Sequence, residues 1–348
     1  MHMDKVRIGL VGSGFMGRTN AELVTRYLPD AVLVAVAGGS RATQLARDYG
    51  VVAEPNVSSL LARSDIDAVI IGSPHSEHAT NAVEAAQRGK HILLDKPMAT
   101  SVEECDRILD AVRQASVTLM MGFSQRFRTC NIAAHRLIRQ GEIGRVTMIL
   151  ERSLSCGGLA SLPPWQSKPE NVGTLLGHAI HNIDRIRWLT GQEIVNVAAQ
   201  VQRELPSGNE VSTMALFGLS GGAMASLWAS WALPKPGFPH SEFSAWIVGE
   251  GGLLDLDAYG ILRLGRGTSW TVVAEQAPVD WKGKGMLDAN RLESYRMQGQ
   301  ELINSIREGR QPSATGEDGR AAVQVAVAAY QSAAEGRTIA LTVKDDAK

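Results

Sequence analysis

Two histidines, His178 and His181, lie three residues apart in the stretch GTLLGHAIHNIDRIRWLTG, which has the pattern of one helix. On a helix that turns about 100° per residue, they share an arc with Asn182 and Arg185, opposite the apolar residues of the stretch. Imidazole titrates near neutrality, so such a pair can transfer a proton, bind a metal or stand on a solvated helix face. The helix by itself leaves these three interpretations open.

A metal site in this stretch would use Asp184 as a third ligand. Steps of three residues rotate around a helix, however, so His178, His181 and Asp184 do not converge on one point. No cysteine or glutamate stands at the spacing of a known zinc site. The sequence therefore predicts no metal.

A lysine, Lys96, directly follows an apolar run and precedes Pro97, which favours an extended backbone at the lysine. An ammonium group held at the end of a strand can polarise a hydroxyl or carbonyl group, and partial burial would lower its pKa. His75 and Arg126 follow two other apolar runs and are expected at the same edge of the sheet. The alternative is that Lys96 is a solvated surface residue that Asp95 neutralises.

The stretch GSGFMG places Gly12, Gly14 and Gly17 between an apolar run and a helical pattern. In a nucleotide-binding loop the first glycine allows a tight turn, the second allows a pyrophosphate to approach, and the third lets the helix pack on the strand. The phosphates then lie at a helix N-terminus, where unpaired N–H groups and the helix dipole favour an anion. The pattern predicts a dinucleotide cofactor.

The residues after the second apolar run bear on which dinucleotide is used. An acidic residue there would bind the ribose 2′-hydroxyl of NAD, but no Asp or Glu occurs between Ala31 and Arg47. Ser40 and Arg41 stand in its place, and a serine with a guanidinium can bind a 2′-phosphate. The sequence therefore favours NADP over NAD. The alternative is that Ser40 only caps a helix that Arg41 opens.

The elements that would position these residues fall into two regions. Up to about residue 127, apolar runs alternate with helical patterns, which indicates a parallel sheet covered by helices on both faces. The later chain has hairpin-like spacing, which predicts a largely antiparallel sheet with strands at 146–153, 195–203, 212–218, 223–231, 243–248 and 261–264. A helix at 319–335 and a strand at 338–343 close the chain. We expect two domains, residues 1–125 and 126–348.

Length and composition limit the classes of function. A chain of 348 residues, 44% hydrophobic and 20% charged, is long enough for two packed domains. Its formal net charge of −1 gives no support for a nucleic-acid or anionic-membrane partner, and no run reaches the roughly 18 apolar residues of a membrane span. The three cysteines form no CxxC pair, which suits a reducing cytoplasm.

Four stretches together resemble the Gfo/Idh/MocA family of oxidoreductases: GSGFMG, GSPHSEHATNAVEAAQRGKHILLDKPMATSVEE, GFSQRF and GHAIHNIDRIRWLTGQE. The resemblance covers nearly the whole chain and implies an α/β protein. Its N-terminal Rossmann domain would hold a doubly wound parallel sheet, and its C-terminal α+β domain a large, open-faced and mostly antiparallel sheet. It implies hydride transfer between NAD(P) and a secondary alcohol or ketone of a sugar, cyclitol or dihydrodiol. It also implies a homodimer or homotetramer formed through the C-terminal sheet.

The resemblance also assigns roles to residues. LLDKP is similar to the family's Glu-Lys-Pro signature, and His181 matches the family's histidine, so Lys96 and His181 are the expected catalytic residues. The expected cofactor-binding residues are Gly12, Ser13, Gly14, Phe15, Met16, Gly17, Ser40, Arg41, Ser73, Pro74, His75, His78, Asp95, Lys96, Gln125 and Arg126. The expected substrate-binding residues are Lys96, Arg126, Trp165, Lys168, His178 and His181. For Trp165 and Lys168, an ordinary loop anchored by prolines is the alternative.

One position departs from the family pattern Asp-x-x-x-His. Gly177 stands where that pattern has its aspartate, so a carboxylate that would orient the reacting groups is missing. This departure leaves open a non-catalytic nucleotide-binding regulator. A lyase or glycosidase that retains NAD and oxidises its substrate only transiently is a further alternative. The leading hypothesis is an NAD(P)-dependent dehydrogenase or reductase.

Overall fold

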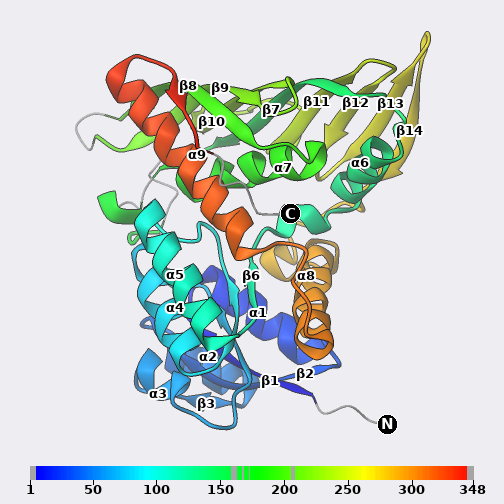
Figure 1. Cartoon of the computed structure of the whole chain (residues 1–348). Helices are drawn as coiled ribbons and strands as arrows, with labels where there is room; N and C mark the ends of the chain where they lie inside the picture. The colour runs from blue at the N-terminus through cyan, green and yellow to red at the C-terminus, as the bar shows by residue number, and fades with distance from the viewer. Residues whose placement is uncertain (1–4, 158–162, 167, 172, 205–207, 343–348) are drawn as a thin grey trace. The chain divides into compact units, whose positions relative to one another are not determined.

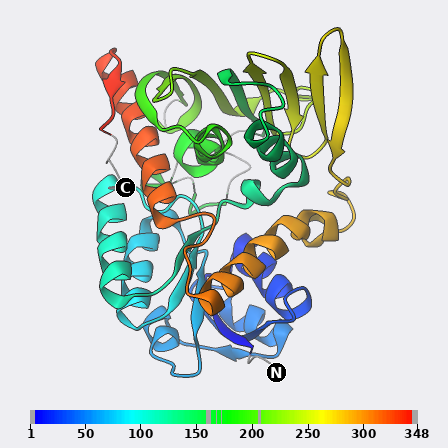
Figure 2. The same ribbon diagram turned by 45° about the vertical axis from the view of Figure 1, so that its right-hand side comes forward.

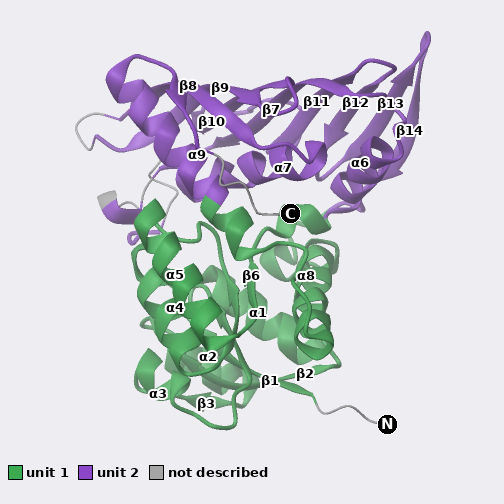
Figure 3. Ribbon diagram, in the orientation of Figure 1, with its two compact units in different colours: residues 1–127, 279–320 green, residues 128–278, 321–348 purple. Residues whose placement is uncertain are grey.

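The computed structural model describes residues 5–157, 163–166, 168–171, 173–204 and 208–342 (Figure 1, with a second view in Figure 2). The chain divides into two compact units: residues 1–127 and 279–320 form unit 1, and residues 128–278 and 321–348 form unit 2 (Figure 3). The division expected from the sequence differs from these units because it assigned residues 279–320 to the second domain.

Helix α8 (Ala289–Glu308) explains that difference, since it packs on helix α1 (Phe15–Arg26) of unit 1. A Cβ atom at Gly299 of α8 would lie 3.5 Å from a methyl carbon of Leu23 in α1 and 2.7 Å from one of Leu28, just after α1. The two helices therefore approach closely, with Leu292, Leu302 and Ile303 buried. The sequence analysis assigns no element to this helix.

Unit 1 is built on a six-stranded parallel sheet in the order β3-β2-β1-β4-β5-β6, which is the order of a Rossmann fold. Its strands are β1 (Val6–Val11), β2 (Ala31–Ala37), β3 (Val52–Ala53), β4 (Ala68–Ile71), β5 (His91–Leu94) and β6 (Leu119–Met121). Its other helices are α2 (Ala42–Tyr49), α3 (Val57–Leu61), η1 (His75–Glu77), α4 (His78–Gln87), α5 (Val102–Ala115), η2 (Ser124–Phe127) and η6 (Gly285–Leu287). All four residues of β4 are buried, as expected of a strand covered on both faces.

Unit 2 is built on a nine-stranded sheet in the order β14-β13-β12-β11-β7-β10-β9-β8-β15. Neighbouring strands are antiparallel, except that β10 and β7 are parallel. The strands are β7 (Val146–Cys156), β8 (Ile194–Arg203), β9 (Glu210–Leu219), β10 (Met224–Leu233), β11 (Phe243–Gly249), β12 (Leu253–Asp257), β13 (Ile261–Arg266), β14 (Ser269–Glu275) and β15 (Ile339–Ala340). The expected fold class is confirmed.

The helices of unit 2 are α6 (Thr129–Arg139), η4 (Pro169–Asn171), a π-helical turn η5 (Leu175–Ala179) and α7 (Ile180–Thr190). Helix α9 (Gly316–Glu335) begins in unit 1 and continues into unit 2. Figure 1 shows α6 and α7 along one face of the nine-stranded sheet. The other face exposes large apolar side chains, among them Met214, Leu216 and Met224. We call it the open face.

The sequence analysis missed strands β12 and β14. Most residues of β14 are exposed, so burial does not alternate along this strand as it does along a half-buried one. The predicted strand at 338–343 is shorter in the structure, and its residue 343 lies outside the described residues. No helix among the described residues is long and apolar enough to span a bilayer.

Candidate functional site

The glycine loop between β1 and α1 is closed by backbone contacts at two of its three glycines. Gly12 has φ +106°, and a Cβ atom there would lie 2.5 Å from the carbonyl oxygen of Gly72. A Cβ atom at Gly17 would lie 2.2 Å from the carbonyl oxygen of Gly12. At Gly14 the nearest atom, Arg41 Nη2, would be 3.8 Å away. Gly14 therefore leaves space at the loop, while Gly12 and Gly17 bring strand, loop and helix together.

The N-terminus of α1 suits an anion. Gly14 is its N-cap residue, no side chain caps it, and its first turn holds no acidic residue. The first N–H groups of a helix have no intrahelical partner, and here the N-cap residue offers no side-chain acceptor. These features fit the pyrophosphate of a dinucleotide.

Arg41 lies beside this loop because the chain after β2 turns back on it. Gly38 and Gly39 have φ +81° and +78°, and the backbone N–H of Arg41 donates to Ser13 Oγ at 3.2 Å. Helix α2 begins at Ala42 with Arg41 as its N-cap residue. The alternative in which Ser40 caps a helix opened by Arg41 is therefore wrong. Arg41 is exposed, and its guanidinium is the positively charged group found within 4 Å of a Cβ atom at Gly14.

His78 connects the ends of β4 and β5. Its Nδ1 lies 2.7 Å from the carbonyl oxygen of Pro97, and its Nε2 lies 3.0 Å from that of Ser73. Burial lowers the pKa of His78, and a neutral ring can donate to only one of the two carbonyls. Asn81 Nδ2 donates to Ser73 Oγ at 3.0 Å. The side chain of His78, predicted to bind the cofactor, is thus occupied with the backbone and holds the two strand ends together.

Lys96 lies at the end of β5, as predicted, and is partly buried. Its peptide bond to Pro97 is cis. Asp95 Oδ1 accepts the backbone N–H of Lys96 at 2.9 Å. The aspartate carboxylate therefore orders the backbone at the lysine.

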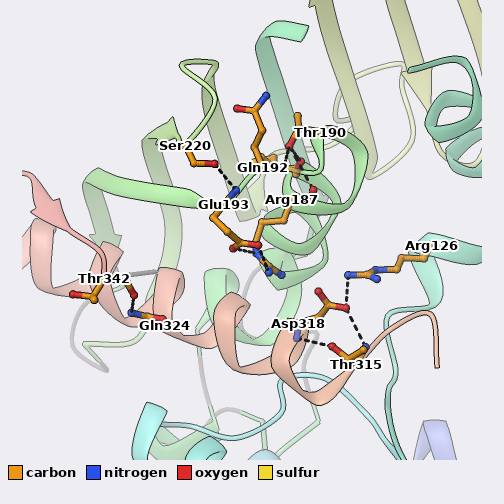
Figure 4. Close-up of polar contacts among 11 residues, drawn as sticks. Arg126, Arg187, Thr190, Gln192, Glu193, Ser220, Thr315, Asp318, Gln324 and Thr342 are labelled. Carbon is orange, nitrogen blue, oxygen red and sulfur yellow. Dashed lines mark hydrogen bonds and ion pairs between the residues drawn. The ribbon is translucent and has the colours of Figure 1, made fainter. Parts of the chain in front are cut away.

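Arg126 is buried in unit 1, and its guanidinium bonds to residues that precede and begin α9. Its Nη2 lies 3.1 Å from Asp318 Oδ2 (Figure 4). Its Nη1 donates to the carbonyl oxygen of Ser313. Asp318 also accepts the backbone N–H of Thr315 at 3.0 Å. These bonds hold Arg126, in η2, against the start of α9, and its predicted cofactor and substrate contacts stay predictions.

The histidine-bearing stretch is mostly buried, with His181, Asn182 and Arg185 nearly inaccessible and His178 partly exposed, so the solvated face weighed for it is wrong. Asn182 Nδ2 donates to Glu151 Oε2 at 2.8 Å and Arg185 Nε to Glu151 Oε1 at 2.9 Å, while Arg185 Nη2 bonds to Glu151 Oε2. Glu151, Asn182 and Arg185 are each at most 1% exposed. The polar arc of α7 therefore faces β7 through a buried ion pair instead of facing water.

The first turn of this stretch is π-helical, with its N-terminal end bound to a buried carboxylate. Glu210 accepts the N–H of Leu175 at 3.1 Å, the hydroxyl of Thr213 at 2.7 Å and the hydroxyl of Tyr330 at 2.9 Å. Burial raises the pKa of Glu210, while these donors lower it by smaller amounts. The α-helical step of 100° does not apply through a π-turn, so periodicity could not predict the direction of His178 relative to His181.

The two histidines lie against one aromatic ring. The ring of Phe243 is 4.8 Å from that of His178 and 5.8 Å from that of His181, the latter edge-on. His178 Nε2 lies 2.7 Å from Glu242 Oε1. Glu242 thus provides a carboxylate beside His178, in a stretch where Gly177 provides none. No motif in the sequence marked Glu242 or Phe243; only the closeness of β11 to α7 reveals them.

Trp165 and Lys168 lie in a stretch of which residues 158–162, 167 and 172 are outside the described part. Trp165 is partly buried and Lys168 is exposed, and the Lys168 N–H lies 3.4 Å from the carbonyl oxygen of Trp165. Their predicted substrate contact stays a prediction. Within the described residues, no three His, Cys, Asp or Glu side chains cluster as metal ligands would.

Comparisons with known proteins match both parts of the chain. The family model "Oxidoreductase family, NAD-binding Rossmann fold" matches residues 6–123, and the GFO/IDH/MocA C-terminal domain matches residues 132–255. The scyllo-inositol 2-dehydrogenase (NAD(+)) of Bacillus subtilis (strain 168) is 27% identical over 98% of this chain and 97% of its own length. The 2,7-anhydro-N-acetylneuraminate hydratase of Escherichia coli (strain K12) is 25% identical over 79% of this chain and 74% of its own length.

A solved structure agrees with these matches. The scyllo-inositol dehydrogenase from Lactobacillus casei, solved with NAD(H) and scyllo-inositol, superposes with a TM-score of 0.80 and 25% identity. The superposition covers 97% of this chain and 99% of that one. Because models of both family domains match in order along the sequence, the chain belongs to the Gfo/Idh/MocA family and is an NAD(P)-dependent oxidoreductase.

Proposed function

We propose that the protein is a dehydrogenase or reductase that transfers a hydride between NAD(P) and a secondary alcohol or ketone of a cyclitol, sugar or dihydrodiol. The glycine loop carries this proposal, because Gly12 and Gly17 are closed by backbone while Gly14 leaves room beside the N-terminus of α1. When bound, NAD(P) supplies the nicotinamide carbon that accepts or returns the hydride. Relatives named for inositol make cyclitols the first substrates to test.

NADP is the proposed cofactor form. Two local features support it: no Asp or Glu occurs between Ala31 and Arg47, and the Arg41 guanidinium lies beside Gly14. A guanidinium can bind a 2′-phosphate with two parallel hydrogen bonds, which the 2′-hydroxyl of NAD cannot accept equally. The relative from Bacillus subtilis is named for NAD(+), so the proposal rests on Arg41 and not on the comparison.

Lys96 and His181 are the proposed catalytic residues. During oxidation, the Lys96 ammonium stabilises negative charge on the reacting oxygen, and His181 accepts the hydroxyl proton. During reduction, His181 returns that proton. His178 is proposed to bind substrate, and its contact with Glu242 at 2.7 Å would orient its ring for that purpose.

A lyase or hydratase that retains NAD is the second candidate. It is favoured by one observation, the relative from Escherichia coli that is named as a hydratase. The two candidates differ in net redox change. A dehydrogenase reduces one added NADP for each substrate oxidised, whereas the second candidate turns over with tightly bound NAD and leaves the added cofactor unchanged.

The experiment that tests the proposal is a panel of cyclitols, sugars and dihydrodiols with NAD and NADP, measured by the absorbance of reduced nicotinamide. We expect stoichiometric reduction with at least one cyclitol or sugar, and faster turnover with NADP. Product formation without net reduction of added cofactor would replace the dehydrogenase by the second candidate.

The proposed assembly is a homodimer or homotetramer that uses the open face of the nine-stranded sheet. Adjacent strands β7, β9 and β10 expose Met148, Met214, Leu216 and Met224 on that face, with 39% to 62% of each side chain accessible. Contiguous exposed apolar residues of this kind usually mark an interface. Light scattering on Leu216→Glu tests this, because a charge on the interface should lower the measured mass.

The proposed location is the cytoplasm. All three cysteines, Cys105, Cys130 and Cys156, are free thiols in the structure, as expected in a reducing compartment. Fractionation of cells that express the tagged protein tests the location.

A further inference from the structure

A cavity of about 190 Å³ lies in unit 2 beside the end of β7 and is lined by Arg152, Leu154, Leu233, Phe238, Ser241 and Ser244, among others. Successive residues of a strand point to opposite faces of its sheet. Glu151 bonds to α7, so its neighbour Arg152 points to the open face. The cavity is therefore separated by the sheet from the buried ion pair of α7.

Arg152 enters this cavity with part of its guanidinium unsatisfied. The guanidinium carbon lies 4.4 Å from the centre of the Trp246 ring, so the two groups stack. Its Nε and Nη2 are buried and have no hydrogen-bond partner among the described residues. Burial of unpartnered N–H groups is unfavourable, most of all on a charged group.

In other arginines of this protein, the edge formed by Nε and Nη2 binds a carboxylate. In Arg185, Nε and Nη2 both bond to the carboxylate of Glu151, one residue before Arg152. In Arg187 they lie 2.6 and 2.7 Å from the two oxygens of Glu193 (Figure 4). The same edge binds a carboxylate in Arg7 with Asp67, Arg296 with Glu293, and Arg320 with Asp106. In Arg152 this edge is without its carboxylate.

No acidic side chain lines the cavity in the described part of the chain. Two carboxylates on β12, the strand next to β11, are already occupied. Asp255 accepts Trp246 Nε1 at 3.1 Å and Arg263 Nη1 at 3.0 Å, and Asp257 accepts the N–H of Ser241 at 3.0 Å. No lining carboxylate among the described residues pairs with Arg152, so an anion from solution can take that place.

We infer that the cavity binds a small organic acid, whose carboxylate pairs with the Nε and Nη2 edge of Arg152. Since Arg152 lines the cavity, rotation about its last side-chain torsion can turn that edge toward a bound ligand. Leu154, Leu233 and Phe238 provide apolar walls for the remainder of the acid. Cavities of roughly 150 Å³ hold benzene, so the volume fits an acid with a compact apolar or aromatic body. The site lies on the open face and does not depend on the proposed dehydrogenase activity.

Isothermal titration of the full chain with benzoate, and with benzamide as the neutral analogue, tests this inference. We expect benzoate to bind about 10- to 100-fold more tightly than benzamide, the range for hydrogen bonds to a charged group. Arg152→Gln should remove that difference. Arg263→Gln on the same face, which leaves the cavity lining unchanged, should retain it.

Two further measurements separate the alternatives. Leu154→Trp should fill the cavity and abolish benzoate binding although Arg152 is intact. This variant tests the site even if Arg152→Gln does not fold. Equal binding of benzoate and benzamide, or unchanged benzoate affinity in Arg152→Gln, would overturn the inference. A third result would also overturn it: the wild type binds no benzoate, and Arg152→Gln forms a smaller oligomer than the wild type. The guanidinium would then pair with a carboxylate of a second copy.

Discussion

The glycine loop of unit 1 and the histidine helix of unit 2 are positioned by different interactions. Backbone atoms in close contact hold the loop, as the 2.2 Å between a Cβ at Gly17 and the oxygen of Gly12 shows. Buried charged groups hold the helix, since Arg185 bonds to Glu151 and Leu175 bonds to Glu210. Neutralising a buried carboxylate leaves its partner uncompensated, whereas a loop held by backbone has no such weakness. The helix should therefore be the more sensitive of the two regions to changes of charge and pH.

The largest expected effect concerns the chemistry at the helix. His181→Ala should lower turnover by about 10²- to 10⁴-fold, the range for general acid–base catalysis, because the hydroxyl proton loses its acceptor. His178→Ala should mainly raise KM. Steady-state kinetics of the two variants measure this. Normal turnover of His181→Ala with an inactive His178→Ala would reverse the two roles.

The next effect concerns the ion pair that holds the helix. Glu151→Gln should lower the free energy of unfolding by about 3–5 kcal/mol, because Arg185 would keep a buried charge without its partner. The matched control is Glu193→Gln, which removes the partly exposed partner of Arg187 on the same helix and should cost about 1 kcal/mol or less. Urea denaturation compares the two variants. Similar losses in both would show that burial does not distinguish these pairs.

Lys96→Met tests the strand end of unit 1, where the backbone is ordered independently of the lysine side chain. Turnover should fall by about 10²-fold or more because the reacting oxygen loses its stabilising charge. NADPH affinity, measured by fluorescence titration, should stay within about twofold, since Gly12, Gly14 and Gly17 are untouched. Lys282→Met, at an exposed position of the same unit, is the control. Full activity of Lys96→Met would make Lys96 an ordinary surface residue.

Arg41→Ala tests the cation beside the glycine loop. NADPH binding should weaken by about 1.5–3 kcal/mol, the value of hydrogen bonds to a charged group, and NADH binding should hardly change. Arg47→Ala on the same helix, also exposed, should leave both affinities unchanged. A wild-type preference for NADH, or equal loss of both cofactors in Arg41→Ala, would contradict the proposed NADP selectivity.

The smallest effect is a pH dependence at the start of the helix. Burial raises the pKa of Glu210 in the folded protein, so the folded state binds this proton more readily than the unfolded state. The stability that this proton provides is complete below the ordinary pKa of glutamate and is lost as the pH rises toward the raised value.

Glu210→Gln should remove this slope, which is at most about 1.4 kcal/mol per pH unit. The measurement is the difference between the unfolding free energies of the wild type and the variant across that pH window, because other carboxylates shift in the opposite direction. A constant difference would mean that Glu210 titrates alike in both states.

Local patterns predicted much of unit 1. The spacing of Gly12, Gly14 and Gly17 identified the loop, and apolar runs identified the parallel strands, because both depend on neighbours in sequence. The same reasoning placed His75, Lys96 and Arg126 near strand ends, and the family resemblance added His78, but neither could predict their contacts. His78 bonds to the carbonyl of Pro97, and Arg126 pairs with Asp318, which is 192 residues away in sequence numbering (318 − 126).

Unit 2 was predicted less completely, because the contacts that position its helix α7 join residues that are distant in sequence. The polar arc of α7 resembles a solvated face, because periodicity records which residues are polar and not what they contact. Only the fold brings Glu151 of β7 to Arg185 and Glu242, the residue before β11, to His178. The π-turn at Leu175–Ala179 also changes the direction of side chains in a way that α-helical spacing cannot predict.

The sequence by itself therefore determined the fold class, the glycine loop, the lysine at the end of β5 and the family, because each is written in short stretches with specific spacing. The tertiary structure decided which charges are buried, which are paired and which are left without a partner. Arg185 and Arg152 lie on α7 and β7 with similar sequence surroundings of mixed polarity, yet one is paired with Glu151 and the other has a bare guanidinium edge. Pairing depends on which strand or helix folds opposite a residue, and that is a property of long-range packing and not of local sequence.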